Sequence, residues 1–185
     1  MRIVLATGGA RSGKSRWAQA RALELGGAAV TCVVTGSASD EEMVRRIAAH
    51  RRERPAAWIT MEAPTRAAAA VAAAQTPVVL LDCLSLLVAG AVLPAGDEQA
   101  ALAAADAAVD ELLRAAAARA GTLLVVTNEV GSGIVPAAPL GRWYRDALGR
   151  ANQRLAAAAG EVVLLVAGVP LTLRPPGLAP PPDGL

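Results

Sequence analysis

The stretch that decides the fold lies near the start of the chain and reads Gly8-Gly9-Ala10-Arg11-Ser12-Gly13-Lys14-Ser15. The apolar run Ile3–Thr7 before it predicts a buried strand, and Ser15–Leu25 after it predicts a helix. The glycines, Lys14 and Ser15 fit the pattern G-x-x-x-x-G-K-S/T at every fixed position, in the strand–loop–helix context that this pattern requires. We therefore predict a phosphate-binding loop, or P-loop. Its backbone N–H groups bind phosphate, Lys14 reaches the β- and γ-phosphates, and the Ser15 hydroxyl ligates Mg²⁺.

Predicted strands and helices alternate along the rest of the chain. Further strands are expected at Ala28–Thr35, Val78–Leu81, Thr122–Thr127 and Val162–Val166, with a short one at Leu171–Arg174. Further helices are expected at residues 39–54, Thr65–Gln75, Gln99–Arg119 and Arg142–Ala159. Such alternation predicts an α/β fold, a mostly parallel sheet with helices on both faces that binds ligands at the carboxyl ends of its strands. We expect one domain over residues 1–174 and a proline-rich tail, 175–185, that is extended or disordered.

Asp82 is a second candidate for the nucleotide site. It follows the four apolar residues of the strand 78–81, and an acid in this place is the Walker B pattern, which sets a carboxylate near Mg²⁺. Many strands end in an aspartate, so the pattern gains its weight from the P-loop.

Composition narrows the choice of partners and compartment. The net charge is +2, and the arginines are spread along the 185 residues, which argues against an electrostatic nucleic-acid binder. The longest apolar stretch carries Asp82 and is too short to span a membrane. Cys32 and Cys83 lie in apolar runs and are interpreted as core thiols. We expect a soluble, cytoplasmic protein.

Several residue types occur once or twice, and they stand out in a chain rich in alanine and arginine. Lys14 is the only lysine, His50 the only histidine and Tyr144 the only tyrosine, while Asn128 and Asn152 are the only asparagines. A residue type kept so sparingly is a candidate for a chemical role, and chance is the competing interpretation. The P-loop decides the matter for Lys14 alone.

His50 lies on the predicted helix 39–54, on one face with Met43, Ile47 and Arg54. A packed core histidine and a catalytic histidine both fit this pattern. The neighbouring arginines fit polyphosphate binding and a solvated helix face equally well. Residue patterns alone leave the role of His50 open.

The chain resembles the bifunctional adenosylcobinamide kinase/adenosylcobinamide-phosphate guanylyltransferase family over residues 1 to about 174. The resemblance rests on blocks in the family's order and spacing: the P-loop; Glu42-Met43, Arg46-Ile47 and His50; Trp58 with Glu62; residues 80–84; Thr127 to Pro136; Arg142 to Asp146; and Gly149 to Gln153. The P-loop is common to many families, whereas the stretch from Asn128 to Gln153 is specific to this one.

The resemblance implies two reactions and a site. The enzyme phosphorylates the aminopropanol hydroxyl of adenosylcobinamide with a nucleoside triphosphate, ATP or GTP. It then transfers GMP from GTP to that phosphate through a GMP-histidine, giving adenosylcobinamide-GDP and pyrophosphate. His50 matches the histidine, so the resemblance implies that His50 and Lys14 are catalytic. The implied nucleotide contacts are Gly8, Gly9, Ala10, Arg11, Ser12, Gly13, Lys14, Ser15, Val34, Thr35, Gly36, Arg51, Arg52, Glu53, Arg54, Glu62 and Asp82.

Further features follow from the same resemblance. Ser15 and Asp82 would hold Mg²⁺, the fold would be RecA-like, and the protein would assemble as a homotrimer. The segment Val34–Gly36 is the least secure assignment, because family members vary there. A solvent-facing Arg11 is as compatible with the P-loop as a phosphate contact.

Two other functions fit parts of the sequence. A small-molecule or nucleotide kinase without guanylyl transfer would have the same P-loop and Asp82, and would form no covalent GMP adduct. A regulatory P-loop NTPase would bind or hydrolyse nucleotide without phosphorylating cobinamide. The stretch from Asn128 to Gln153 weighs against both.

Overall fold

The computed structural model describes residues 1–36, 45, 51–52 and 54–178. They form a seven-stranded sheet in the order β3-β2-β4-β5-β1-β6-β7. The first six strands of this order are parallel, and the edge strand β7 is antiparallel to β6. The strand bounds are β1 Arg2–Gly8, β2 Val30–Val34, β3 Ile59–Glu62, β4 Val78–Asp82, β5 Thr122–Val126, β6 Glu161–Val166 and β7 Val169–Arg174.

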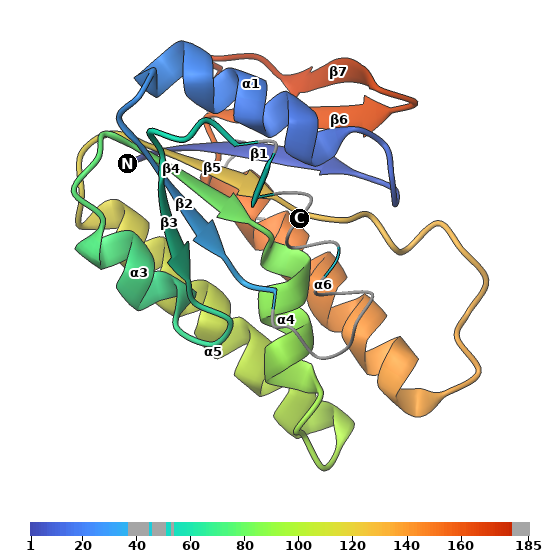
Figure 1. The fold of residues 1–185 in the computed structure, drawn as a ribbon. Helices are drawn as coiled ribbons and strands as arrows, with labels where there is room; N and C mark the ends of the chain where they lie inside the picture. Colours follow the sequence, from blue (N-terminus) through green and yellow to red (C-terminus); the bar gives the residue numbers. More distant parts are fainter. Residues whose placement is uncertain (37–44, 46–50, 53, 179–185) are drawn as a thin grey trace.

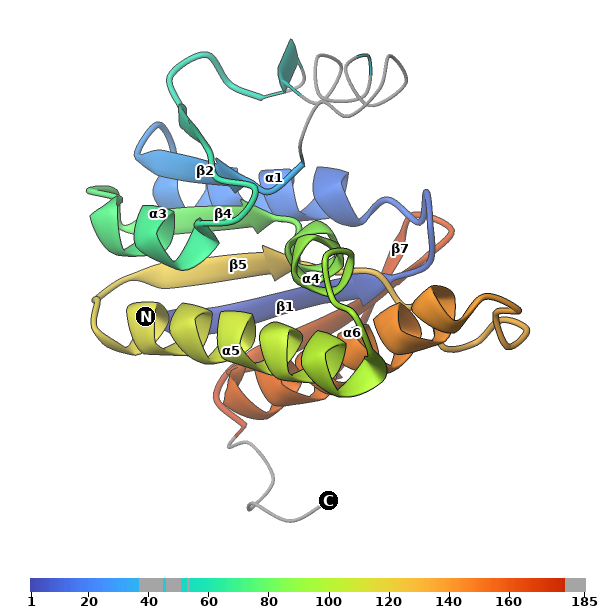
Figure 2. The same cartoon turned by 90° about the horizontal axis from the view of Figure 1, so that it is seen from below.

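Helices pack against both faces of this sheet, as predicted (Figures 1 and 2). One face is covered by α1, which packs on β1, β4 and β5, and the other by a layer of α3, α4, α5 and α6. The helix bounds are α1 Lys14–Gly26, α3 Ala67–Ala73, α4 Leu84–Val92, α5 Glu98–Ala117 and α6 Pro139–Ala158. The mostly parallel α/β fold expected from the alternating pattern is therefore confirmed.

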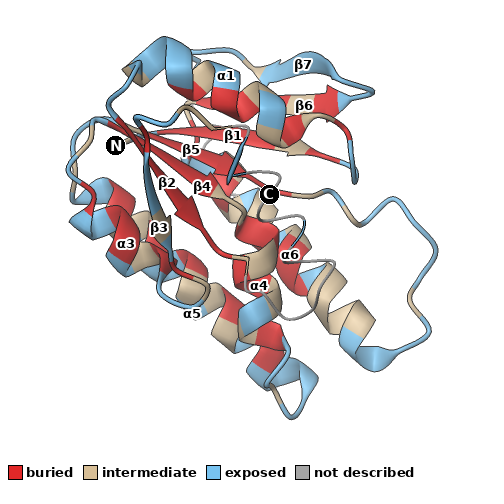
Figure 3. Ribbon diagram, viewed as in Figure 1, coloured by how far each residue is buried: buried red, intermediate tan, exposed pale blue. Residues whose placement is uncertain are grey.

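The core lies in two layers because successive side chains of a strand point to opposite faces. Leu5 and Val125 pack under the four-helix layer, whereas Val4 and Val126 pack under α1. Central strands are thus buried on both sides, while β3 and β7 are mostly exposed (Figure 3). Cys32 and Cys83 are free thiols, and burial raises the pKa of Cys32 to about 12, as expected of a core residue.

Two elements of the described structure, one strand and one helix, were not predicted from the sequence. The strand β3 is short, and most of its residues are exposed, so it lacks the apolar run by which the other strands were recognised. The helix α4 follows β4 after only Cys83, so strand and helix merge into one apolar stretch without a turn signal. The start of α6 was also placed too late: it begins at Pro139, because proline fits the first turn of a helix. The predicted helix 39–54 falls mostly outside the described residues.

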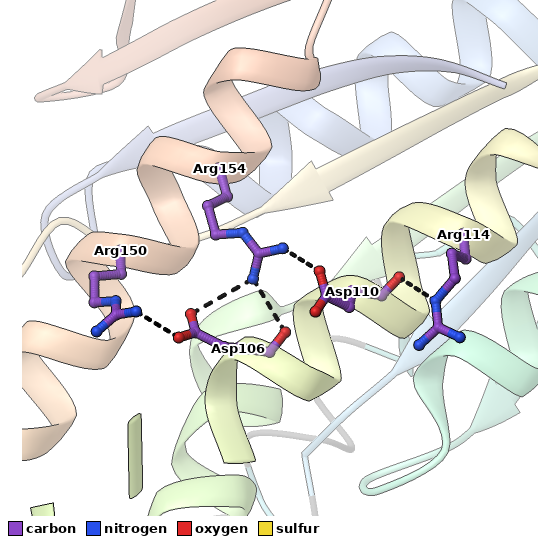
Figure 4. A network of polar contacts seen from close by, with 5 residues as sticks. All are labelled: Asp106, Asp110, Arg114, Arg150 and Arg154. Atoms are coloured by element: carbon purple, nitrogen blue, oxygen red, sulfur yellow. Dashed lines mark hydrogen bonds and ion pairs between the residues drawn. The ribbon is translucent and has the colours of Figure 1, made fainter. Parts of the chain in front are cut away.

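Ion pairs lock α5 to α6 (Figure 4). Arg150 pairs with Asp106 at 2.6 Å, and Arg154 contacts both Asp106 and Asp110. These side chains are partly exposed, so each pair contributes little, about 1 kcal/mol or less. They link α5 to α6, which carries Asn152, a residue of the site described below.

Candidate nucleotide-binding site

The P-loop forms the turn between the end of β1 at Gly8 and the start of α1 at Lys14. Gly13, the residue before the helix, has φ 94°, and Arg11 has φ 56°. Among the described residues no side-chain hydrogen bond caps the N-terminus of α1, so its first N–H groups have no side-chain partner there. A helix N-terminus in this state carries a partial positive charge and binds anions.

The loop is seated on the turn between β6 and β7. Gly168 N donates a hydrogen bond of 2.9 Å to the Ser12 carbonyl. A Cβ at Gly8 would lie 2.4 Å from the Leu165 carbonyl oxygen, and one at Gly13 would lie 3.2 Å from Gly168 Cα. Glycine is therefore required at both positions by close backbone packing as well as by the positive φ.

Lys14 lies across the loop, where its Nζ donates a hydrogen bond of 2.7 Å to the Gly9 carbonyl. The side chain is buried. Burial lowers the pKa of Lys14, while Cys83 and Asp82 nearby raise it. A desolvated ammonium at this position suits the neutralisation of phosphate charge. Within the described residues the buried Ser12 hydroxyl has no hydrogen-bond partner.

Ser15 and Asp82 meet at the carboxyl end of the sheet. Ser15 Oγ lies 3.4 Å from Asp82 Oδ1, although the two residues come from α1 and β4. A hydroxyl beside a carboxylate is a donor set that suits Mg²⁺, which usually takes only one or two protein ligands and completes its shell with water and phosphate oxygens. The described part of the chain has no group of three or more His, Cys, Asp or Glu side chains that could hold a metal by themselves.

Thr35 joins β2 to the segment after Asp82. Its hydroxyl donates to the Cys83 carbonyl at 2.6 Å and accepts from the Cys83 N–H at 2.9 Å. Val34 is buried in the core, and its carbonyl accepts a hydrogen bond of 2.8 Å from Ala63 N. The predicted nucleotide contacts Val34, Thr35 and Gly36 therefore lie at the correct edge of the sheet. Their direct contact with nucleotide remains a prediction.

The remaining predicted contacts lie beyond β2. Val34 pairs in register with both Glu62 and Asp82, so these residues lie along the same edge. Glu62 is exposed and lines a shallow hollow of about 330 Å³ between β3 and α3. Arg51 and Arg52 are exposed. Arg54 is half-buried, close enough to Cys32 to oppose the effect of burial on its pKa. His50 and Glu53 lie outside the described residues.

Sequence reasoning assigned no role to a polar cluster at the end of β5. Thr127 Oγ1 donates to Asn152 Oδ1 at 2.7 Å, and Asn152 Nδ2 donates to the Asn128 carbonyl at 3.0 Å. Two signals pointed to these residues: the scarcity of asparagine in the chain, and their place in the blocks Thr127 to Pro136 and Gly149 to Gln153 that carry the family resemblance. Neither signal showed that the two asparagines touch or that they lie beside the P-loop.

Fold and site together define a P-loop nucleotide-binding protein of the α/β class. The strand β5 separates the P-loop strand β1 from the Asp82 strand β4, which is the arrangement expected of a RecA-like fold. In the part of the chain that the structure describes, no helix is long and apolar enough to cross a membrane.

The particular family follows from comparison with known proteins. Residues 4–173 match the family described as cobinamide kinase / cobinamide phosphate guanyltransferase, and the chain belongs to this family. It is 40% identical over 182 residues to the bifunctional adenosylcobalamin biosynthesis protein CobU of Escherichia coli, covering 93% of this chain and 99% of that protein. It is also 40% identical over 172 residues to the bifunctional adenosylcobalamin biosynthesis protein CobP of Pseudomonas aeruginosa, covering 92% and 96%.

Among solved structures, the flagellar accessory protein FlaH of Methanocaldococcus jannaschii is similar with a TM-score of 0.48 and 13% sequence identity. The match covers 95% of this chain and 79% of that one.

Proposed function

We propose that this chain catalyses both reactions of its family: phosphorylation of adenosylcobinamide by a nucleoside triphosphate, and transfer of GMP from GTP to the phosphate so formed. The observation that carries the proposal is that Ser15 contacts Asp82 at the N-terminus of α1, where Lys14 lies across the P-loop with Asp82 nearby. Membership of the family identifies adenosylcobinamide as the acceptor, and the P-loop is the kind of site that binds a triphosphate.

In the kinase step, the aminopropanol hydroxyl oxygen attacks the γ-phosphorus of ATP or GTP. The bond from that phosphorus to the β,γ-bridging oxygen breaks, and the nucleoside diphosphate leaves with the electron pair. The hydroxyl proton passes to a phosphate oxygen or to water. Lys14 and the N–H groups of the loop stabilise the charge that develops during the transfer.

In the second reaction, we propose that His50 is the nucleophile. A neutral imidazole nitrogen attacks the α-phosphorus of GTP, the bond to the α,β-bridging oxygen breaks, and pyrophosphate leaves. An oxygen of adenosylcobinamide phosphate then attacks the same phosphorus. The phosphorus–nitrogen bond breaks, and the imidazole is regenerated together with adenosylcobinamide-GDP. The exposed Arg51 and Arg52 follow His50 closely in sequence, and they would supply positive charge to the polyphosphate.

Three finer features belong to the proposal. Ser15 and Asp82 would hold Mg²⁺, which when bound neutralises phosphate charge. We place the protein in the cytoplasm, where its nucleotide substrates are abundant. We also propose a homotrimer, which the exposed apolar side chains of the edge strand β7, Val169, Leu171 and Leu173, would help to assemble. Light scattering tests the trimer, and a monomer at working concentration would contradict it.

His50→Asn separates the two activities and tests the proposal. We expect the variant to lose covalent labelling by α-labelled GTP, because an amide is too weakly nucleophilic to replace imidazole. It should still phosphorylate adenosylcobinamide from γ-labelled triphosphate, since that step needs no covalent intermediate. The wild-type adduct should be acid-labile and alkali-stable, as a phosphoramidate is.

A thermal melt of the variant serves as the control for folding. A folded His50→Asn protein that still forms the adduct would exclude His50 as the nucleophile. A wild-type protein that phosphorylates cobinamide without forming any adduct would instead identify a simple kinase. Triphosphate turnover without a phosphorylated corrinoid would identify a regulatory NTPase.

A further inference from the structure

The only two asparagines of the chain are in direct contact. They are 24 residues apart in sequence, yet Asn152 of α6 donates a hydrogen bond of 3.0 Å to the Asn128 carbonyl at the end of β5. The same Asn152 amide accepts a hydrogen bond from Thr127 Oγ1. Thr127 is fully buried. Asn152 therefore holds two consecutive residues of one strand end.

This strand end lies between the two elements that serve the phosphates. Val126 pairs in register with Ala6 on one side and with Asp82 on the other. Beyond the strand, Thr127 N donates to the Ala6 carbonyl at 2.9 Å and Glu129 N donates to the Gly8 carbonyl at 3.0 Å. The backbone of Asn128 is thus fixed alongside the first glycine of the P-loop.

The alternation of the strand decides where the Asn128 side chain lies. Val126 packs under α1, and the Thr127 side chain reaches α6 on the opposite face. Asn128 therefore projects toward the α1 face, on which the P-loop turns into its helix. Its side chain is half-buried. Within the described residues no hydrogen bond to its side-chain amide is found.

We propose that the Asn128 side-chain amide donates a hydrogen bond to the terminal phosphate of the bound nucleotide, and that Asn152 is the positioning residue that aims it. The inference rests on the proposed function, because it takes the P-loop as the triphosphate site. In a P-loop site the lysine, here Lys14, contacts the β- and γ-phosphates, and the Walker B aspartate, here Asp82, would hold the Mg²⁺ that neutralises them. The Asn128 amide lies between the P-loop, which leads to Lys14, and the end of β4, which carries Asp82. A donor in this place faces the phosphate that is farthest from the nucleoside.

The contact would act during the kinase step. As the acceptor oxygen attacks and the bridging oxygen departs, charge spreads over the three equatorial oxygens of the γ-phosphoryl group. A fixed neutral donor stabilises that charge without adding a further cation to a site that already has Lys14.

The orientation of the Asn152 amide follows from its partners. The Asn128 carbonyl can only accept a hydrogen bond, so it requires the Nδ2 group, and the Thr127 hydroxyl must then donate to Oδ1. Asn152→Asp keeps the size of the side chain and its acceptor for Thr127. It replaces the donor by an oxygen that repels the Asn128 carbonyl.

Binding of two probes tests the proposal independently of turnover: β,γ-imido-GTP, which has a terminal phosphate, and GDP, which lacks it. We expect Asn128→Ala to weaken the triphosphate analogue about tenfold or more, as does loss of a hydrogen bond to a charged group, and to leave GDP unchanged. The size-matched Asn128→Asp should weaken the analogue further through charge repulsion. Asn152→Asp should show the same selective loss, with a smaller magnitude. Kinase kcat/KM should fall in all three variants.

Arg154→Met is the matched control. It removes ion pairs between α5 and α6 two residues beyond Asn152 (Figure 4), so it loosens the same helix without touching the strand end. It should keep the wild-type ratio of the two affinities. A loss in Arg154→Met equal to that in Asn152→Asp would reduce Asn152 to a structural role.

Failure of the inference and failure of the proposed function look different. Equal weakening of both probes by Asn128→Ala, or of neither, overturns the contact with the terminal phosphate. Unchanged binding of both probes to Lys14→Ala would instead show that the P-loop is not the nucleotide site. A Thr127→Val and Thr127→Ser pair adds a further check, since only the serine keeps the donor to Asn152 and should retain the selectivity.

Discussion

The P-loop and the end of β5 lie side by side at the carboxyl edge of the sheet, yet they are held in place differently. The P-loop is shaped within its own stretch of sequence: Gly8 and Gly13 have positive φ, and Lys14 Nζ donates a hydrogen bond to the Gly9 carbonyl. The end of β5 is held by a side chain from α6, through Asn152. One half of the site is therefore encoded locally, and the other half depends on the docking of a distant helix.

The two halves are therefore vulnerable to different substitutions. The P-loop tolerates little change at Gly8 and Gly13, where a Cβ would lie 2.4 Å and 3.2 Å from neighbouring backbone atoms. The hydrogen bonds of the Asn152 amide can be weakened by exchanging its nitrogen for an oxygen, a change that leaves the fold intact.

Lys14→Ala should abolish both activities, with rates reduced about 1,000-fold or more, because Lys14 neutralises phosphate charge in either displacement. The assays are γ-phosphoryl transfer to adenosylcobinamide and labelling by α-labelled GTP, with circular dichroism to establish folding. Guanylyl transfer at the wild-type rate would show that the loop does not bind the GTP.

Asp82→Asn should lower Mg²⁺-dependent turnover about 100-fold while nucleotide binding falls less, because under the proposed function the carboxylate would hold the metal beside Ser15. A titration of activity against Mg²⁺ measures the effect. Unchanged activity and an unchanged Mg²⁺ requirement would make Asp82 an ordinary strand terminus.

Gly8→Ala should destabilise the protein by about 3 kcal/mol, since its Cβ would meet the Leu165 carbonyl oxygen at 2.4 Å and its φ is 151°. Urea unfolding provides the measurement. Gly9→Ala is the matched control for stability, because a Cβ there meets no atom of the described residues within 4 Å. Equal loss in the two variants would mean that backbone packing does not explain the requirement at Gly8.

Lys14→Met should raise the thermal stability of the nucleotide-free protein near pH 7, the smallest effect expected. Burial lowers the pKa of Lys14 below its ordinary 10.5, so folding is penalised while the ammonium is charged. The penalty is fully present below the folded-state pKa and fades as pH rises from that value toward 10.5. The difference in Tm between variant and wild type should therefore shrink at alkaline pH, and a constant difference would point to packing alone.

Much of the fold was predictable because its signals are local. The strands β1, β2, β4, β5 and β6 are short apolar runs, and the P-loop carries its own glycines and lysine. The elements that were not predicted are β3 and α4. The first is an exposed edge strand, and the second is joined to β4 without a turn residue, so neither has a periodicity of its own.

The P-loop, the parallel α/β class and the resemblance to a corrinoid-modifying family can be recognised without a structure, because each rests on short stretches of residues that are neighbours in the chain. Only the tertiary structure decided that Ser15 meets Asp82, that the turn at Gly168 seats the loop, and that Asn152 holds the end of β5. Each of these contacts joins residues brought together by sheet order and helix packing. The packing of the whole core fixes the geometry of these contacts, so it cannot be predicted from any single stretch of sequence.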